Sequence, residues 1–195
     1  MKKTISTLLI LYFGLLTSVY SQQELPNPQV LLNEMSEASR NLNYDGVFVY
    51  RQGKQIDTMR IIHKSGADGI YERLVSLTGH AREVIRDGEK VKCYFPENKA
   101  VVVDNSRVGK LISSYLPSPI QSISEFYDFR IAGQDRIAGK DAWIVNVKPN
   151  DKYRYGYQLW IDKESKLLLK SELKNQIGVT LEQIMFAQLD ILDHI

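Results

Sequence analysis

The stretch Ala81-Arg82-Glu83-Val84-Ile85-Arg86-Asp87-Gly88-Glu89-Lys90-Val91-Lys92-Cys93-Tyr94-Phe95 decides the fold. Charged and apolar side chains are interspersed on both sides of its centre, and Lys90-Val91-Lys92-Cys93 alternates with a period of two residues, which is typical of a β-strand with two different faces. The central dipeptide, Asp87-Gly88, favours the tight two-residue turn of a β-hairpin. The sequence therefore predicts two antiparallel strands, Ala81–Arg86 and Lys90–Phe95.

The same alternation recurs on both sides of this hairpin, between short turn-forming segments. Four further strands complete a first meander of six: Val47–Arg51, Asp57–His63, Ile70–Leu77 and, after a turn at Pro96–Lys99, Ala100–Asp104. Five more strands form a second meander: Phe129–Ile137, Ala142–Lys148, Tyr155–Ile161, Leu167–Lys174 and Val179–Leu189. The predicted fold class is mainly β, with an antiparallel sheet of about eleven strands. A sheet of this width rarely stays flat, so we expect it to curl or close.

Two segments depart from the strand pattern. Asn27 is a good N-cap, Pro28 suits the first helical position and apolar residues then recur at helical spacing, which predicts an amphipathic helix over Pro28–Leu42. Asn105–Tyr127 contains two prolines and separates the meanders, and we expect a loop there with a short helix near Ile120–Tyr127. An interruption of this length is a candidate lid or plug.

Several predicted strands are apolar on both faces. Val47 and Val49 alternate with Phe48 and Tyr50, for example, whereas the outer face of a simple two-layer protein is polar. Helices covering one side, and a partner, a further domain or a ligand covering the other, would explain this pattern. Central strands with ordinary exposed apolar atoms would explain it equally well.

The N-terminus has the features of a secretory signal peptide. Lys2 and Lys3 precede an apolar stretch, Leu8–Leu16, and small residues then lead to a cleavage site before Gln22. The apolar stretch is shorter than the roughly 20 residues that span a bilayer, which argues against a membrane anchor. No cysteine lies near the cleavage site, which argues against a lipoprotein. We expect residues 1–21 to be removed, residues 22–28 to form a leader and the exported chain to be soluble.

Composition and motifs disfavour several classes of function. The chain has 195 residues, one cysteine, 25 Lys+Arg and 23 Asp+Glu, so the charges balance once Lys2 and Lys3 are removed. Global charge therefore gives no support for nucleic-acid binding. The single Cys93 excludes a disulfide framework, and the three histidines lack metal-ligand spacing. No phosphate-binding, dinucleotide-binding or nucleophile motif occurs, so we expect no metal, no cofactor and no enzyme activity.

The segment Lys152–Trp160 mixes basic and aromatic residues, a pattern that can bind single-stranded nucleic acid. Strand parity offers a simpler interpretation, in which Tyr153, Tyr155 and Tyr157 share one face of a strand. We rank core packing first and an apolar ligand wall second. Nucleic acid comes last, because export disfavours it.

The strand sequences, taken in order, resemble the RseB/MucB family of periplasmic regulators of the sigma-E envelope-stress response. The resemblance starts with Leu42-Asn43-Tyr44-Asp45-Gly46-Val47-Phe48-Val49-Tyr50 and the Arg51-Gln52-Gly53 that follows. The further matches are Arg82–Gly88, Tyr94-Phe95-Pro96, Tyr127-Asp128-Phe129, Arg136–Gly139, Leu159–Asp162, Leu167–Ser171 and Thr180–Gln183. Each piece is short, and the ordered set over about residues 29–186 carries the resemblance.

The resemblance implies both a fold and a function. The N-terminal domain of this family is similar to the lipoprotein carriers LolA and LolB, an unclosed antiparallel β-barrel with helices plugging an apolar concave side. By resemblance, residues 29–190 form such a half-barrel. The implied function is non-enzymatic: binding of the periplasmic region of an anti-sigma factor (RseA/MucA type), which shields it from the site-1 protease. Acyl-chain lipid or lipopolysaccharide is the implied signal that relieves this block.

Family members also carry a smaller C-terminal domain that contributes to anti-sigma binding. The sequence stops at Ile195, so we expect residues 191–195 to end the half-barrel without that domain, and the uncovered apolar faces are candidate docking sites for it. A periplasmic carrier of lipoprotein or lipid, of the LolA type, is the alternative function. A homodimer is possible, because an unclosed barrel has free edges.

Aromatic residues on the strands of a curved sheet are candidates for the wall or rim of an apolar pocket. The candidates are Phe48, Tyr50, Tyr71, Tyr94, Tyr157 and Trp160, and Arg73 and Arg82 are candidate contacts for an anionic head group. Parity alone does not show which sheet face is concave, so we expect about half of the aromatic candidates to point outward.

Overall fold

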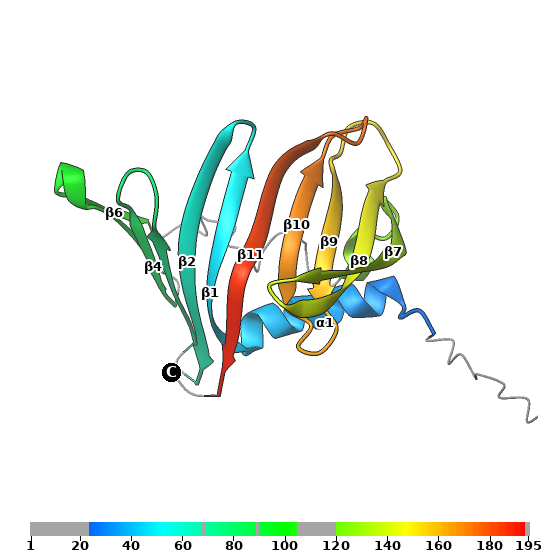
Figure 1. Cartoon of the computed structure of the whole chain (residues 1–195), viewed down its shortest axis with the longest axis horizontal. Helices are drawn as coiled ribbons and strands as arrows, with labels where there is room; N and C mark the ends of the chain where they lie inside the picture. The colour runs from blue at the N-terminus through cyan, green and yellow to red at the C-terminus, as the bar shows by residue number, and fades with distance from the viewer. Residues whose placement is uncertain (1–23, 68, 89, 105–119, 194–195) are drawn as a thin grey trace, which may run out of the picture.

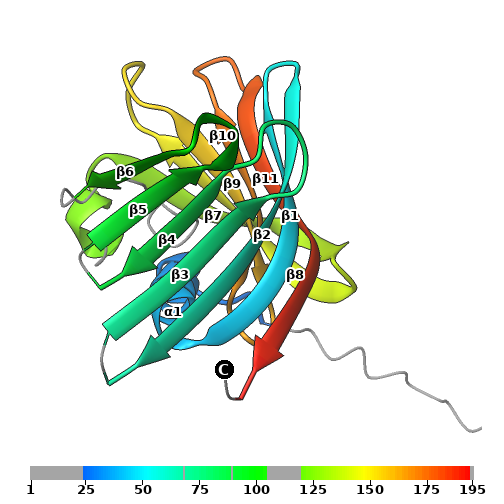
Figure 2. The same ribbon diagram turned by 90° about the vertical axis from the view of Figure 1, so that its left-hand side faces the viewer.

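The computed structural model describes residues 24–67, 69–88, 90–104 and 120–193. Eleven strands form one antiparallel sheet, as predicted (Figures 1 and 2). The strands of the first meander are β1 (Asn43–Gln52), β2 (Gln55–Gly66), β3 (Gly69–Ser76), β4 (Glu83–Asp87), β5 (Lys90–Phe95) and β6 (Ala100–Asp104). Those of the second are β7 (Tyr127–Ile137), β8 (Lys140–Pro149), β9 (Gly156–Asp162), β10 (Leu168–Lys174) and β11 (Thr180–Leu192).

The strand order is β6-β5-β4-β3-β2-β1-β11-β10-β9-β8-β7, so each meander keeps its sequence order. The two meanders join where β1 pairs with β11, in a register that places Phe48 opposite Phe186. The two ends of the sheet, β6 and β7, do not pair with each other. The predicted unclosed sheet is therefore confirmed. At the predicted Asp87-Gly88 hairpin, Gly88 has a φ of 58°, a left-handed conformation that glycine adopts without steric cost.

One α-helix, α1 (Pro28–Asn41), crosses one side of the curved sheet (Figure 2). The Asn27 side chain caps it by accepting hydrogen bonds from the backbone N–H groups of Gln29 (2.9 Å) and Val30 (3.2 Å). Leu31 and Leu32 are buried, and they pack into the hydrophobic core of the sheet. Together, the cap and this apolar stripe confirm the predicted helix.

The pleat gives the sheet two distinct faces. The side on which α1 lies, here called the helix face, carries Tyr44, Phe48 and Phe186, which are buried. The opposite side, here called the outer face, carries the alternate residues of each strand, such as Val47 and Val49, which are half-buried. One hydrophobic core spans both meanders, and most of its members lie on the helix face.

The ends of most strands differ from the prediction by one to four residues, and two local differences need a physical explanation. The short helix near Ile120–Tyr127 is a 3-10 helix, η3 (Ile120–Ile123), and β7 already begins at Tyr127. The strand predicted over Tyr155–Ile161 starts one residue later, because Asp151 accepts hydrogen bonds from the backbone N–H groups of Tyr153 and Arg154 and turns the chain. Tyr153 and Tyr155 therefore lie in a loop, and they do not share a strand face with Tyr157.

The predicted signal peptide (residues 1–21) and residues 105–119 of the predicted lid or plug lie outside the described residues. Within the described part of the chain, no helix has the length and apolar character needed to cross a membrane.

Candidate functional site

The helix face is buried beneath α1 and becomes half-buried at the positions of Tyr50 and Tyr157. Beneath α1, Ser39 of the helix meets Tyr44 and Phe186 of the sheet. Away from α1, two cross-strand rows continue over the centre of the sheet. They consist of Tyr50, Ile184, Ser171 and Leu159, and of Glu182, Leu173, Tyr157 and Val147. Tyr50 and Tyr157 are half-buried here, so part of each ring remains accessible.

Glu182 lies near both tyrosines of this surface. Its carboxylate accepts a hydrogen bond from the Gln52 amide at 2.9 Å. Burial raises the pKa of Tyr50, and the negative charge of Glu182 raises it further. Burial also raises the pKa of Tyr157, with smaller effects from Tyr127 and Glu182. This surface therefore combines aromatic and aliphatic contact area with hydrogen-bonding groups, which are the properties of a binding surface.

Glu182 was not among the residues selected from the sequence. In Thr180-Leu181-Glu182-Gln183 it looks like an ordinary solvated strand residue. Its position two residues before Ile184 could have identified it, because residues two apart on a strand lie on the same face of the sheet.

The structure separates the eight predicted site residues. Phe48 is 3% exposed and belongs to the core, while Tyr50 and Tyr157 lie on the helix face. Strand parity places Tyr71, Tyr94, Arg73 and Trp160 on the outer face. There, Arg73 forms an ion pair with Glu83, at 2.6 Å. Arg82 is exposed between β3 and β4, where it lines a hollow of about 320 Å³ with Met59 and Phe95.

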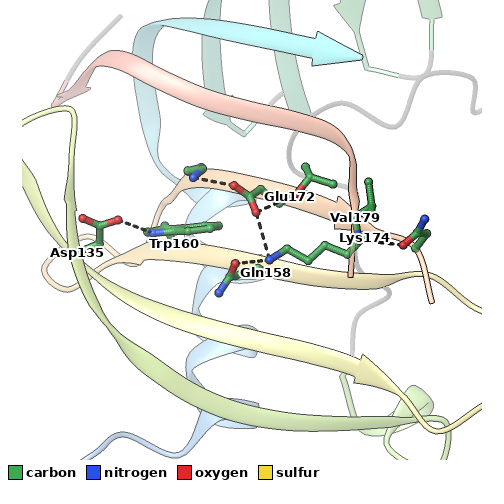
Figure 3. Close-up of polar contacts among 9 residues, drawn as sticks. Asp135, Gln158, Trp160, Glu172, Lys174 and Val179 are labelled. Atoms are coloured by element: carbon green, nitrogen blue, oxygen red, sulfur yellow. Dashed lines mark hydrogen bonds and ion pairs between the residues drawn. The ribbon is translucent and has the colours of Figure 1, made fainter. Parts of the chain in front are cut away.

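Trp160 is buried although it lies on the outer face, because a polar network covers it (Figure 3). Its indole N–H donates to Asp135 at 2.9 Å, and the Lys170 ammonium lies 3.9 Å from its ring centroid. Lys170 pairs with Glu172 at 2.8 Å, and Glu172 also pairs with Lys174 at 3.3 Å. Burial would raise the pKa of Glu172, but its contacts with the two lysines lower it. Trp160 is therefore a packed residue of the scaffold.

A second polar row crosses the helix face of the first meander. Tyr44, His63, Glu72 and Arg86 are successive cross-strand neighbours on β1, β2, β3 and β4. His63 and Glu72 are 0% and 1% exposed. Tyr44 stacks on His63 with ring centroids 4.7 Å apart, and Arg86 pairs with Glu72 at 3.2 Å. Ionisable groups are thus buried in a sheet that is otherwise packed with apolar side chains.

His63 is held in its neutral form. Its Nδ1–H donates to the Leu42 carbonyl at 2.8 Å, and its Nε2 makes no hydrogen bond to any described residue. Burial lowers the pKa of His63 and the nearby Arg86 charge lowers it further, while the hydrogen bond to Leu42 opposes both. The unfolded chain therefore binds a proton at a higher pH than the folded chain, and acid favours unfolding.

We expect the free energy of unfolding to fall as the pH drops below the ordinary histidine pKa of 6.5. Urea unfolding of His63→Gln at about pH 7.5 and about pH 5.5 should show a smaller difference between the two pH values than the unsubstituted chain. His80→Gln is the matched control, because His80 is 97% exposed, and it should keep the full difference. Equal pH dependence in His63→Gln and the unsubstituted chain would contradict this assignment.

Comparisons with known proteins all point to the same family. The family model for the MucB/RseB N-terminal domain matches residues 27–195. The sigma factor AlgU regulatory protein MucB of Pseudomonas aeruginosa is 34% identical over 188 residues, which cover 95% of this chain and 57% of that protein. The sigma-E factor regulatory protein RseB of Haemophilus influenzae is 32% identical, with 93% and 57% covered. The chain therefore spans a little over half the length of these relatives.

The fold is also found in a solved structure of a complex. The complex of Pseudomonas aeruginosa MucA and MucB matches with a TM-score of 0.70 and 31% sequence identity, covering 87% of this chain and 59% of the solved one. The similarity covers both meanders, since it extends over most of the residues that form the sheet.

Proposed function

Because the chain belongs to the MucB/RseB N-terminal domain family, we propose that it is a periplasmic, non-enzymatic regulator of a sigma-E-type envelope-stress response. In this proposal it binds the periplasmic region of a membrane-spanning anti-sigma factor and shields it from site-1 proteolysis. The family match over residues 27–195 carries the proposal. The similarity to a MucB that was solved together with MucA supports the choice of partner.

Calorimetric titration of the chain with the periplasmic region of its cognate anti-sigma factor tests the first part. A saturable complex, together with slower cleavage of the anti-sigma factor by the site-1 protease, is the expected result. Binding without protection would restrict the function to recognition. The absence of binding would remove the proposal for this chain.

We further propose that acyl chains of envelope lipids or lipopolysaccharide bind the helix face around Tyr50 and Tyr157. The half-buried rings of Tyr50 and Tyr157 support this, because they present apolar area next to hydrogen-bonding groups. Occupancy would change the affinity for the anti-sigma factor if lipid binds one state of the domain better than the other.

Tyr157→Ala should weaken binding of a fluorescent acyl-chain probe by about tenfold, because a partly buried aromatic side chain contributes on this scale. Tyr71→Ala on the outer face is the matched control, since it removes the same side chain from a residue that is 37% exposed, and it should leave the affinity unchanged. Circular dichroism should show both variants folded. If the two variants bind the probe equally well, the helix face is not the lipid site.

A further inference from the structure

The antiparallel topology gathers five of the chain's connections at one end of the molecule. Neighbouring strands run in opposite directions, so alternate connections lie at the same end of the strands. The connections at this end are β1–β2, β3–β4, β5–β6, β8–β9 and β10–β11. We call this end of the molecule the hairpin end. Figure 1 shows its loops at the top, and α1 lies toward the opposite end. A surface that meets this end meets several loops at once.

The hairpin end carries exposed apolar side chains. Tyr153 and Ile177, with 81% and 84% exposed, are the most exposed large apolar residues in the described part of the chain. Four further residues of this end, exposed by 48% to 61%, are Ile56, Leu77, Tyr155 and Val179. They come from four connections, with Tyr153 and Tyr155 in one loop and Ile177 and Val179 in another. A hollow lined mainly by polar side chains separates these two loops, so the six residues do not form the contiguous patch that a folded protein partner usually covers.

Hydrogen bonds within the loops hold the backbone that carries these exposed apolar side chains at the loop tips. The Asn175 side chain accepts hydrogen bonds from the backbone N–H groups of Ile177 (3.1 Å) and Val179 (2.9 Å). Asp151 accepts one from Tyr153 at 2.8 Å. The exposed tips are therefore presented by ordered turns, which reduces the entropy lost when they bind a surface.

A cationic cavity of about 560 Å³ lies between the β8–β9 and β10–β11 loops. Four cationic side chains and two carboxylates line it: Arg130, Lys148, Lys152 and Lys174, with Asp128 and Asp151. Both carboxylates are already paired, Asp128 with Arg130 and Asp151 with Arg154. Lys174 donates to Gln158 at 2.6 Å and pairs with Glu172 at 3.3 Å (Figure 3). Lys148 and Lys152 are exposed and form no ion pair with any described residue, so they supply the unpaired positive charge of the cavity.

From this arrangement we propose that the hairpin end docks on the surface of an anionic phospholipid bilayer. Tyr153 and Ile177 enter the interface, where tyrosine is favoured, and Lys148 and Lys152 reach the phosphate groups. A bilayer has charge at its surface and hydrocarbon just below it. It therefore complements isolated apolar tips around a cationic hollow better than a rigid protein surface does. The proposal is independent of anti-sigma binding.

Sedimentation with vesicles tests this with a chain that starts at Gln22, which contains the whole described core from Leu31 to Leu189. Vesicles of phosphatidylglycerol and phosphatidylcholine should bind the chain, and vesicles of phosphatidylcholine alone should bind it much less. Tyr153→Ser with Ile177→Ser should lower the partition coefficient about tenfold. Lys148→Gln with Lys152→Gln should lower the partition coefficient about thirtyfold. Added salt should weaken vesicle binding of the unsubstituted chain more than that of this variant, because the variant lacks the two charges that salt screens.

Matched controls lie toward the opposite end of the strands. Tyr71→Ser with Ile191→Ser, and Lys64→Gln with Lys90→Gln, remove the same groups from exposed positions there and should leave partitioning unchanged. Equal binding by the test and control variants would overturn the proposal, as would equal binding to both vesicle types. Binding of soluble glycerol phosphate in the absence of any vesicle binding would also overturn it. Anti-sigma titration of the same variants should be normal, which separates this result from failure of the proposed regulatory function.

Discussion

Gly46→Val is expected to lower the free energy of unfolding by about 3 kcal/mol, because this position has no room for a side chain. Gly46 is buried on the helix face between Tyr44 and Phe48. A Cβ atom there would lie 2.6 Å from Cε1 of Phe186 and 3.0 Å from the Gln188 carbonyl oxygen. The Phe186 ring is itself 3% exposed and packs edge-on against Phe48, so it has no free space to move into.

Urea denaturation measures this effect, and Gly66→Val is its control. Gly66 ends β2, and a Cβ atom there would meet nothing within 4 Å, so the free energy should change by less than about 0.5 kcal/mol. Combining Gly46→Ala with Phe186→Leu should cost less than the sum of the single changes, because the smaller side chain leaves room for the added methyl group. Additive costs would show that Phe186 is not the obstacle.

Glu72→Ala should destabilise the domain by about 3 kcal/mol, because it leaves the partly buried Arg86 guanidinium without its carboxylate. The Glu72 and Arg86 side chains are 2% and 21% exposed, so water replaces the lost partner poorly. The adjacent outer-face pair, Arg73–Glu83, is 45% and 28% exposed and lies on the same two strands. Glu83→Ala should therefore cost less than about 1 kcal/mol.

The double variant Glu72→Leu with Arg86→Met distinguishes a lost ion pair from lost packing. Replacing both charges by apolar groups removes the partly buried guanidinium that Glu72→Ala deprives of the Glu72 carboxylate, so the double variant should be more stable than Glu72→Ala. Thermal unfolding followed by circular dichroism is sufficient for the comparison. A double variant as unstable as Glu72→Ala would show that the shape of the pair matters more than its charge.

Local patterns predicted the elements of this fold well. The alternation around Asp87-Gly88 gave β4 and β5 with their turn, and the Asn27 and Pro28 signals gave the start of α1. These elements depend on interactions within a few residues. They are the period of two residues in a strand, the left-handed conformation of a glycine in a turn and the side chain that caps a helix. The predicted start at Tyr155 was wrong because the Asp151 carboxylate accepts hydrogen bonds from the backbone N–H groups of Tyr153 and Arg154, and an aspartate can turn a chain in this way or simply face solvent.

The candidate site was harder to predict, because it depends on contacts between distant strands. Trp160 and Tyr157 are three residues apart and lie on opposite faces, and parity shows this without showing which face α1 covers. Lys170 and Asp135, which cover Trp160, come from other strands. The buried row of His63, Glu72 and Arg86 depends on the register of three strands. In the sequence these residues look like the solvated side of alternating strands.

The pairing of β1 with β11 has a consequence for biosynthesis. These strands begin at Asn43 and Thr180, so more than a hundred residues separate the two partners at the centre of the sheet. In the exported chain proposed above, the first meander reaches the periplasm first, and its central edge stays without a partner until the eleventh strand has followed it. Contacts between residues so distant in sequence form slowly, and an open strand edge attracts other chains in the meantime. Periplasmic holdase chaperones would therefore act on β1 until β11 arrives.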